Sequence, residues 1–461
     1  MIAKELLDPK SIVIVGASAD IHKPGGRVLF NLKNNSYKGQ IYAVNPKETE
    51  IQGVKCYAKV EDLPQVDCAI LAIAAKYCPA TVDTLALQKG TKGFIIFTAG
   101  FSELNEEGAA LEKHIVDTIN SVGGSLLGPN CIGFINSNYS GVFAGFTPIP
   151  DPHGVELISG SGSVQGWLSE YGSTYGLSFN SIWTFGNSNQ MGIEDVFEYL
   201  DETFDPEKSS RAILFYLEKI TDPQKLLKHA RSLIDKGCKI AGISAGSSLA
   251  GSRAVSAHTG SLPLPDELVD DLFRKAGIVR CENRLELTMV GGIFLQPELK
   301  GKNVAVITHA GGPAVMLTDV LCNNGMDVPP LEGPKAKELL SKLFNGSTVA
   351  NPIDILATGT AEQLGHVIDA MENDFDNIDC MCVLYGSPGL FPNYDAYNVL
   401  DEKMKTCKKP IFPILPSIVN AKEEIEYFVH TKHRYNYTEE CVFGKALCKV
   451  YNTYKPQPEL P

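Results

Sequence analysis

One histidine stands among small and hydroxyl-bearing residues near the middle of the chain. The segment from Gly251 to Ser261 reads GSRAVSAHTGS, and His258 is its only imidazole. A neutral imidazole is a good nucleophile toward phosphorus, and it titrates close to pH 7. Glycine lets the backbone move, and hydroxyl groups donate hydrogen bonds. Taken alone, the pattern fits a histidine in a surface loop better than a mobile phosphate carrier, and the rest of the chain reverses this order.

Two glycine-rich turns could hold the phosphate that such a histidine would accept. Each follows an apolar run and precedes a predicted helix. Their residues are Gly160, Ser161, Gly162 and Ser163 in the first turn, and Ala310, Gly311 and Gly312, followed by Pro313, in the second. A helix N-terminus presents free N–H groups and the positive end of its dipole to an anion. Two such termini converging on one phosphoryl group would hold it without a metal ion, although a purely structural origin stays open for each turn.

A third turn near the start of the chain could approach a different phosphate. Its residues are Gly16, Ala17, Ser18, Lys23 and Gly25. The G-x-G-x-x-G spacing of nicotinamide sites is absent, and Asn45 and Lys47 stand where such a site places an acid for the ribose diol. A lysine there suits a ribose phosphate, and coenzyme A (CoA) carries a 3′-phosphate. The turn therefore favours CoA over a nicotinamide cofactor, with a tight turn that binds nothing as the alternative.

Short apolar runs that alternate with helical stretches must position these turns. The predicted strands cover residues 11–15, 41–44, 68–73, 93–97, 155–158, 182–185, 212–216, 239–243, 303–308, 379–384 and 410–415. This rhythm is typical of parallel strands joined by crossover helices.

Passages rich in proline and glycine near residues 146–154 and 296–301 divide the series. The chain has 461 residues, which is too long for one compact core. We therefore predict three doubly wound α/β domains. The predicted ranges are 1–128, 129–297, which carries His258, and 298–461.

Composition limits the partners and the compartment. The net charge of −13 argues against nucleic acid and anionic membranes as partners. The longest apolar run, residues 68–75, is far shorter than a membrane span, and the start has no signal-peptide pattern. The 12 cysteines show no metal-ligand spacing. We expect reduced, mostly buried thiols, a cytoplasmic location and no metal site in this chain.

Ten short motifs, in order along nearly the whole chain, resemble the α subunit of the NDP-forming acyl-CoA synthetases, in the superfamily that includes succinyl-CoA synthetase. They are VGAS at 15–18, KPGG at 23–26, VNPK at 44–47, TAGFSE at 98–103, GPNCIG at 128–133, SGSG at 159–162, YLE at 216–218, SAHTGSL at 256–262, ITHAGGP at 307–313 and NPIDI at 351–355. The resemblance implies an ADP-forming acid–CoA ligase of the acetate–CoA ligase type. It also implies that the first domain is a Rossmann-like CoA-binding domain and that the other two are flavodoxin-like.

The resemblance also implies a role for each motif. The first domain would bind CoA through the third turn, Asn45, Lys47 and the turn of Thr98, Ala99 and Gly100. His258 would accept phosphate, and Glu218 would hydrogen-bond one imidazole N–H. Asn130, with Gly186 and Asn187, would lie near the acyl phosphate and the CoA thiol. The two glycine turns would clamp the phosphoryl group.

In the implied reaction, acyl-CoA and phosphate give acyl phosphate and CoA, and His258 then takes the phosphoryl group and releases the carboxylic acid. The loop between Ser244 and Pro265 would swing and pass the phosphate to ADP. The sequence contains no Walker-type P-loop and no stretch resembling an ATP-grasp domain. ADP or ATP and Mg²⁺ would therefore bind a separate ATP-grasp β subunit, typically in an α2β2 heterotetramer.

Departures from the family pattern leave alternatives open. The run before the histidine, SAGSS at 244–248, lacks the Lys and Arg of many relatives, and His309 replaces the usual Asn. The turn at 159–162 reads SGSG where SQSG is common. A CoA-binding regulatory module without turnover remains an alternative, as does a nicotinamide dehydrogenase on the first domain alone. His309 becomes a second candidate phosphate contact.

Overall fold

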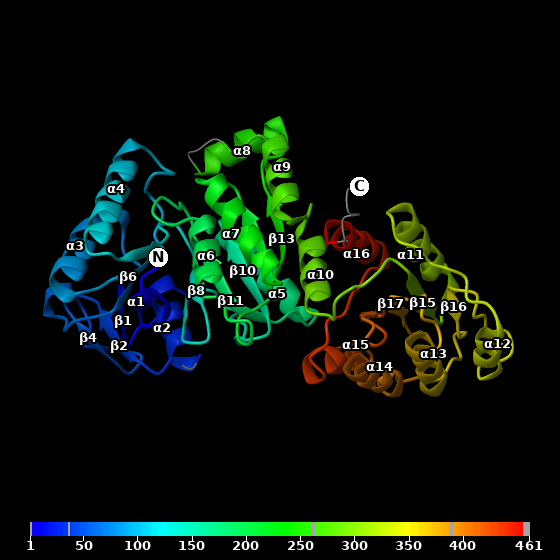
Figure 1. Cartoon of the computed structure of the whole chain (residues 1–461). Coiled ribbons are helices and arrows are strands. Elements are labelled where there is room, and N and C mark those ends of the chain that lie inside the picture. Colours follow the sequence, from blue (N-terminus) through cyan, green and yellow to red (C-terminus); the bar gives the residue numbers. More distant parts are fainter. Residues whose placement is uncertain (1, 36, 260–262, 388, 390, 455–461) are drawn as a thin grey trace. The chain divides into compact units, whose positions relative to one another are not determined.

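The computed structural model describes residues 2–35, 37–259, 263–387, 389 and 391–454, with the side chains of residues 258 and 259 excepted. The chain forms two compact units (Figure 1). The first comprises Met1–Glu170 and Ser178–Ile278, and the second Tyr171–Leu177 and Val279–Pro461. The three predicted domain ranges stay a prediction. Among the described residues, no helix is both long and apolar enough to cross a bilayer.

The first sheet of the first unit is a parallel sheet with one short antiparallel edge. Its order is β3-β4-β2-β1-β5-β6-β7. The strands are β1 (Ser11–Val15), β2 (Gln40–Val44), β3 (Glu50–Ile51), β4 (Val54–Tyr57), β5 (Cys68–Leu71), β6 (Gly93–Ile96) and β7 (Ser125–Leu127). Strands β2, β1, β5, β6 and β7 run parallel. The central strands are continuous apolar runs because both faces of such a sheet are covered.

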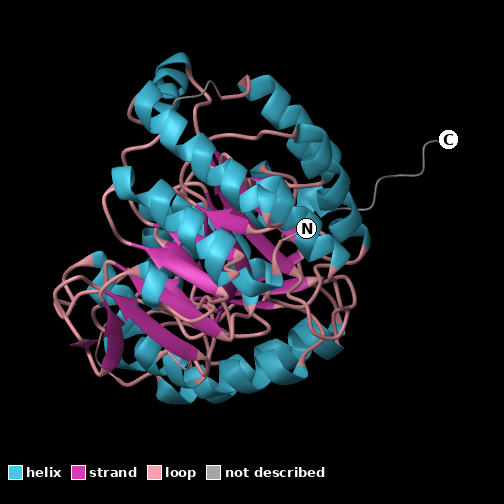
Figure 2. Cartoon of the chain, turned by 90° about the vertical axis from the view of Figure 1, so that its left-hand side faces the viewer, coloured by secondary structure: helices cyan, strands magenta, loops and turns pink. Residues whose placement is uncertain are grey.

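Helices connect these strands and pack on the sheet, as the cyan helices around the magenta strands illustrate (Figure 2). The connecting helices are α2 (Pro24–Asn34), α3 (Cys78–Lys89) and α4 (Glu106–Ser121), and α1 (Lys4–Leu7) precedes β1. Strand β1 is central: the chain goes to β2 on one side of it and later returns to β5 on the other. Ligands of open α/β sheets bind at such a switch point, beyond the carboxyl ends of the strands.

In the second sheet, the strands that belong to the first unit have the order β13-β12-β10-β11-β8-β9. They are β8 (Gly133–Ile135), β9 (Ser140–Val142), β10 (Val155–Ser159), β11 (Phe179–Thr184), β12 (Ala212–Leu217) and β13 (Lys239–Ser244). The helices are α5 (Gly162–Thr174), α6 (Ile193–Glu202), α7 (Pro223–Asp235), α8 (Leu249–Thr259) and α9 (Asp266–Ala276). Strands β13, β12, β10 and β11 are parallel, whereas β8 and β9 extend the sheet antiparallel.

The second unit contains a smaller parallel sheet of order β16-β15-β17-β18. Its strands are β15 (Val304–Thr308), β16 (Ile353–Asp354), β17 (Cys380–Leu384) and β18 (Ile411–Ile414), and β14 (Val279–Arg280) precedes them. The helices are α10 (Arg284–Phe294), α11 (Gly311–Asn323), α12 (Pro334–Ser341), α13 (Ala361–Asn373), α14 (Tyr394–Thr406), α15 (Lys422–Glu426) and α16 (Glu440–Tyr454). The predicted α/β fold class with parallel-dominated sheets is confirmed.

The segment around His258 differs from the expected loop, because α8 covers most of it. Ser248 caps this helix: its Oγ accepts the Gly251 N–H at 3.0 Å. Val255 is buried and anchors the helix. Glycines and serines favoured a loop, but a good N-cap and one buried side chain outweigh their low helix propensity. His258 lies in the last turn of α8, and its side chain is outside the described residues.

Candidate active site

A cavity of about 260 Å³ lies at the carboxyl edge of the second sheet. Three neighbouring parallel strands, β11, β10 and β12, end there. The loops that follow them supply most of the polar lining. The predicted site residues in the lining are Asn130, Gly160, Ser161, Gly162, Ser163, Gly186, Asn187 and Glu218. The structure therefore brings into one cavity residues that are up to 88 positions apart, from Asn130 to Glu218 (218 − 130).

The glycine turn after β10 contains one glycine that the packing requires and one that it does not. The Ser161 N–H donates to Ser159 Oγ at 3.1 Å, which fixes the turn before α5. A Cβ on Gly162 would lie 2.5 Å from Ile132, so packing requires this glycine. A Cβ on Gly160 would have 3.9 Å to its nearest neighbours. Packing within the chain does not require Gly160, and a ligand that approaches the backbone would explain it.

Glu218 follows β12 and lies beside this turn. Ser159 at the end of β10 is in register with Tyr216 at the end of β12. The Tyr216 hydroxyl donates to Glu218 Oε1 at 3.0 Å. Burial, and then the neighbouring Glu218 charge, raise the pKa of Tyr216, so the phenol stays protonated and can donate. The pair holds the Glu218 carboxylate at the cavity wall.

Asn130 and Gly186 meet at a close approach of two backbones. Asn130 has φ +62° and Gly186 has φ +61°. A Cβ on Gly186 would lie 2.1 Å from the carbonyl oxygen of Pro129, so the contact excludes any side chain there. The Asn187 N–H donates to the same oxygen at 3.0 Å. The loop after β7 is thus held against the loop after β11.

Two carboxylates near this site were missed by the sequence analysis. The Asn187 amide donates to Glu103 Oε2 at 2.6 Å and to Glu112 Oε2 at 3.1 Å. Burial raises the pKa of Glu103, but hydrogen bonds from the Gly100 N–H and from Asn187 outweigh it, and the pKa is lowered. Glu103 ends the TAGFSE motif, which was a usable signal. Glu112 is 1% exposed on α4, and nothing in the sequence distinguishes it from other helical acids.

The apolar lining residues of this cavity were also missed. They are Phe97, Ile132, Phe143, Ile158, Phe185, Ile193 and Leu217. Phe97 and Phe143 pack edge to face with ring centroids 4.9 Å apart. Lys219 is the one basic residue among the lining residues that the structure describes, and its Nζ lies 3.4 Å from Asn189 Oδ1.

The residues predicted to bind CoA lie at the carboxyl edge of the first sheet, after β1, β2 and β6. Gly16 has φ +87°, and a Cβ on Gly25 would lie 2.1 Å from the Gly16 carbonyl oxygen. The Asn45 amide donates to the Ala17 carbonyl oxygen at 2.9 Å. These residues maintain the shape of the turn.

The other residues predicted to bind CoA at this edge differ in their solvent exposure. Lys23, Lys47 and Ala99 are exposed, and Ser18 and Gly100 are half-buried. The Thr98 hydroxyl donates to the Ile73 carbonyl oxygen at 2.5 Å. Lys23 and Lys47 therefore supply exposed positive charge beside the turn.

The second glycine turn belongs to the second unit. Ala310 is the N-cap of α11, and Gly311 and Gly312 are exposed with no packing contact that requires glycine. His309 accepts the Gly386 N–H at Nε2 over 2.8 Å and stacks on Tyr385 with ring centroids 4.4 Å apart. Burial lowers the pKa of His309, although the Asp354 charge opposes this. The convergence of the two glycine turns stays a prediction.

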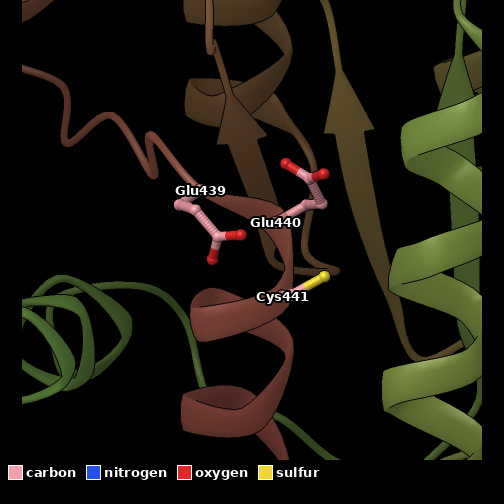
Figure 3. Close-up of side chains that lie close together, drawn as sticks. All are labelled: Glu439, Glu440 and Cys441. Carbon is pink, nitrogen blue, oxygen red and sulfur yellow. The ribbon is translucent and has the colours of Figure 1, made fainter.

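Glu439, Glu440 and Cys441 at the start of α16 have potential metal-ligand atoms within 4.8 Å of one another (Figure 3). Glu439 accepts the Val442 N–H at 2.5 Å, which is the contact of a helix cap. Burial and the two carboxylates raise the pKa of Cys441, and a protonated thiol is a poor metal ligand. Helix capping accounts for the position of Glu439.

Similarity to characterised proteins decides the family. Residues 10–137 match the CoA binding domain, and residues 152–294 match the succinyl-CoA ligase like flavodoxin domain. The α subunit of ADP-forming acetate–CoA ligase II of Pyrococcus furiosus is 32% identical over 397 residues, which cover 85% of both chains. This chain belongs to the ADP-forming acyl-CoA synthetase α subunits. The predicted enzyme class, an ADP-forming acid–CoA ligase that uses CoA, phosphate and adenine nucleotide, is confirmed for this family.

Other members of the family extend the match. The α subunit of acetate–CoA ligase I of the same organism is 30% identical over 439 residues and 92% of both chains. The dinucleotide-forming acetyl-CoA synthetase 1 of Ca. Korarchaeum cryptofilum, solved with phosphate and ADP, superposes with a TM-score of 0.85 at 25% identity, over 98% of this chain and 96% of that chain. Acetate–CoA ligase I of Archaeoglobus fulgidus is longer, and the match spans 54% of its length.

Proposed function

We propose that this chain converts an acyl-CoA and inorganic phosphate into acyl phosphate and CoA, and then carries the phosphoryl group on His258 toward ADP. The observation that carries this proposal is the shared cavity, where the start of α5 and the Glu218 carboxylate line the same walls. The first provides N–H groups for an anion, and the second provides an acceptor for an imidazole N–H. The family assignment supports the same reaction.

In the first step a phosphate oxygen attacks the thioester carbon. The carbon–sulfur bond breaks, and CoA leaves as a thiol with the proton that the phosphate loses. The N–H groups of the turn at Gly160–Ser163 hold the phosphate, and the Asn130 amide donates toward the carbonyl oxygen as it gains charge. The exposed Lys23 and Lys47 attract the phosphates of CoA on the first sheet.

In the second step an imidazole nitrogen of His258 attacks phosphorus. The bond between phosphorus and the acyl oxygen breaks, and the carboxylate leaves. Glu218 accepts the other imidazole N–H, which fixes the tautomer and stabilises the positive ring. In the third step an oxygen of the ADP β-phosphate takes the phosphoryl group, and the nitrogen–phosphorus bond breaks.

We further propose that the nucleotide and Mg²⁺ bind a separate ATP-grasp β subunit in an α2β2 assembly in the cytoplasm. The relatives of similar length are named as α subunits, which implies a partner subunit for those proteins. The described residues lack a P-loop sequence, in agreement with this division. Co-purification and mass measurement of the two chains would test the assembly.

Phosphate transfer to the chain alone is the deciding experiment. The purified chain is incubated with radiolabelled phosphate and a panel of thioesters: acetyl, isobutyryl, phenylacetyl and succinyl. We expect an acid-labile, base-stable phosphoprotein with at least one thioester, and no label in His258→Asn. His114→Asn is the matched control, because His114 lies on the surface of α4 and pairs with Asp83.

Two outcomes would contradict the proposal. Equal labelling of His258→Asn would show that another residue accepts the phosphate. CoA binding by calorimetry, with no labelling and no phosphate–acyl exchange in the presence of the β subunit, would instead establish a regulatory CoA-binding module.

A further inference from the structure

A second and larger cavity lies at the opposite edge of the second sheet. Its volume is about 710 Å³, within the range of small-molecule sites. It is lined at the amino ends of β10, β11 and β12, by Glu156, Ser181 and Ile213 among others. The candidate active site is at the carboxyl ends of the same strands. The proposed acyl and phosphoryl transfers do not use this cavity.

A buried carboxylate is the polar centre of its lining. Glu156 is 3% exposed. Ser181 Oγ donates to its Oε2, and the Asn180 amide donates to its Oε1 at 2.5 Å. The Trp183 indole N–H donates to Ser181 Oγ at 2.6 Å and completes the chain of donors. Burial raises the pKa of Glu156, and the hydrogen bonds from these donors oppose that shift only in part, so a cation beside the carboxylate would favour its ionised form further.

No ion pair joins Glu156 within the part of the chain that the structure describes. Among the ionised lining residues, Asp205 pairs with Lys208 at 3.0 Å, and Asp8 pairs at 3.0 Å with Lys10, which lies outside the lining. Lys4 and Glu202 also line the cavity, and neither has an ion pair among the described residues. A buried carboxylate that is hydrogen-bonded but lacks a cation can gain from a positive ligand group.

Aromatic rings form the wall beside this carboxylate. Trp183 packs against Phe134 with ring centroids 4.4 Å apart and against Tyr199 at 6.1 Å. All three line the cavity, together with Phe204. Aromatic faces attract organic cations and also bury an apolar body.

We propose that this cavity is a second ligand site, which binds an organic ammonium ion with an apolar, preferably aromatic, body. The ammonium group pairs with Glu156, and the body packs on Trp183, Phe134 and Tyr199. Carboxylate and rings together select against anions, so the site does not compete for the acid, the phosphate or the CoA of the proposed reaction.

Tryptophan fluorescence of the full chain tests this directly. The sequence contains two tryptophans, and Trp167→Phe leaves Trp183 as the single reporter. We expect 2-phenylethylammonium chloride to change its emission with a saturable curve and a Kd below about 1 mM. The neutral isostere 2-phenylethanol should bind at least tenfold more weakly, since it lacks the charge-assisted bond to Glu156.

Two variants in the Trp167→Phe background identify the site. Glu156→Gln keeps the size of the side chain and should weaken the amine at least tenfold while leaving 2-phenylethanol unchanged. Thr203→Phe places a ring at an exposed position of the lining and should abolish amine binding, at the cost of the hydrogen bond from the Thr203 hydroxyl to the Tyr199 carbonyl oxygen. The second variant keeps the test valid if Glu156→Gln fails to fold.

Three results would overturn the proposal. They are the absence of a saturable change at about 10 mM amine, equal affinity for the amine and the alcohol, and amine affinity that neither variant alters.

Discussion

The hydroxyl of Tyr216 and the carboxylate of Glu218 form the side-chain pair on which the proposed phosphoryl transfer depends. Glu218→Gln keeps the size but loses the charge that stabilises the imidazolium, so we expect labelling of His258 to slow by roughly 10²-fold or more. Tyr216→Phe removes only one hydrogen bond to Glu218, worth about 1 kcal/mol, and should slow labelling about fivefold. Single-turnover labelling measures both rates, and a Glu218→Gln rate equal to wild type would remove this residue from the mechanism.

We predict that Lys47 distinguishes CoA from its analogue without the 3′-phosphate. If this exposed lysine contacts that phosphate, Lys47→Ala should weaken CoA roughly two- to fivefold at low salt and leave dephospho-CoA unchanged. Lys38→Ala is the control, because Lys38 is exposed near the amino end of β2, at the opposite edge of the sheet. Calorimetric titration of wild type and both variants with each ligand gives the six affinities. An equal loss for both ligands in Lys47→Ala would place the 3′-phosphate elsewhere.

His309 makes the stability of the second unit depend on pH. Its Nε2 accepts a backbone N–H, so protonation breaks this bond, and burial lowers its pKa below the ordinary value of 6.5. The unfolded chain therefore binds the proton first, and the contribution present above about pH 6.5 is lost as the pH falls toward the folded value. Thermal unfolding of wild type should decline more between about pH 7.5 and about pH 5.5 than that of His309→Asn. Parallel curves for the two proteins would exclude the effect.

At the scale of elements, two glycines that look alike in the sequence should respond in opposite ways. Gly186→Ala forces a Cβ against the Pro129 carbonyl oxygen at a left-handed φ, and we expect it to destabilise the first unit by about 1–3 kcal/mol. Gly160→Ala meets no close neighbour, so stability should hold while labelling of His258 falls, because the new methyl group enters the phosphate turn. Denaturant unfolding and labelling of each variant measure both effects. Loss of stability in Gly160→Ala would give this glycine a packing role.

Eleven of the strands could be predicted from the sequence, whereas α8 and the short strands β3, β4, β7, β8, β9, β14 and β16 could not. Buried parallel strands leave short apolar runs with turn residues behind them, and each predicted run overlaps a strand of the structure. The small residues before His258 carry no apolar periodicity, so the cap at Ser248 and the burial of Val255 decide the helix. The sequence motifs predicted Asn130, the turn at Gly160 and Glu218 as site residues, and all of them line one cavity. The phenylalanines of that cavity escaped prediction because core and cavity walls use the same residue types.

At the scale of the whole molecule, the thiols report how firmly the units are packed. All twelve cysteines are free, and Cys322 alone is exposed. Burial raises the pKa of Cys68, Cys78, Cys131 and Cys238 to about 12. We expect one thiol to react rapidly with an aromatic disulfide reagent, the half-buried Cys407 and Cys441 to react slowly, and the rest only on unfolding. Cys322→Ser should remove the rapid phase, and more than three rapid thiols would reveal a unit that opens readily.

The chain segment from Thr98 to Glu103 belongs to two neighbourhoods at once. Thr98 and Gly100 follow the end of β6, where we propose that CoA binds. Glu103 accepts a hydrogen bond from Asn187, which lines the cavity of the candidate active site. A ligand that restrains one end of this six-residue segment should restrain its other end too. Binding of CoA should therefore alter the affinity of the chain for orthophosphate. By thermodynamic linkage, orthophosphate should alter the affinity for CoA by the same factor.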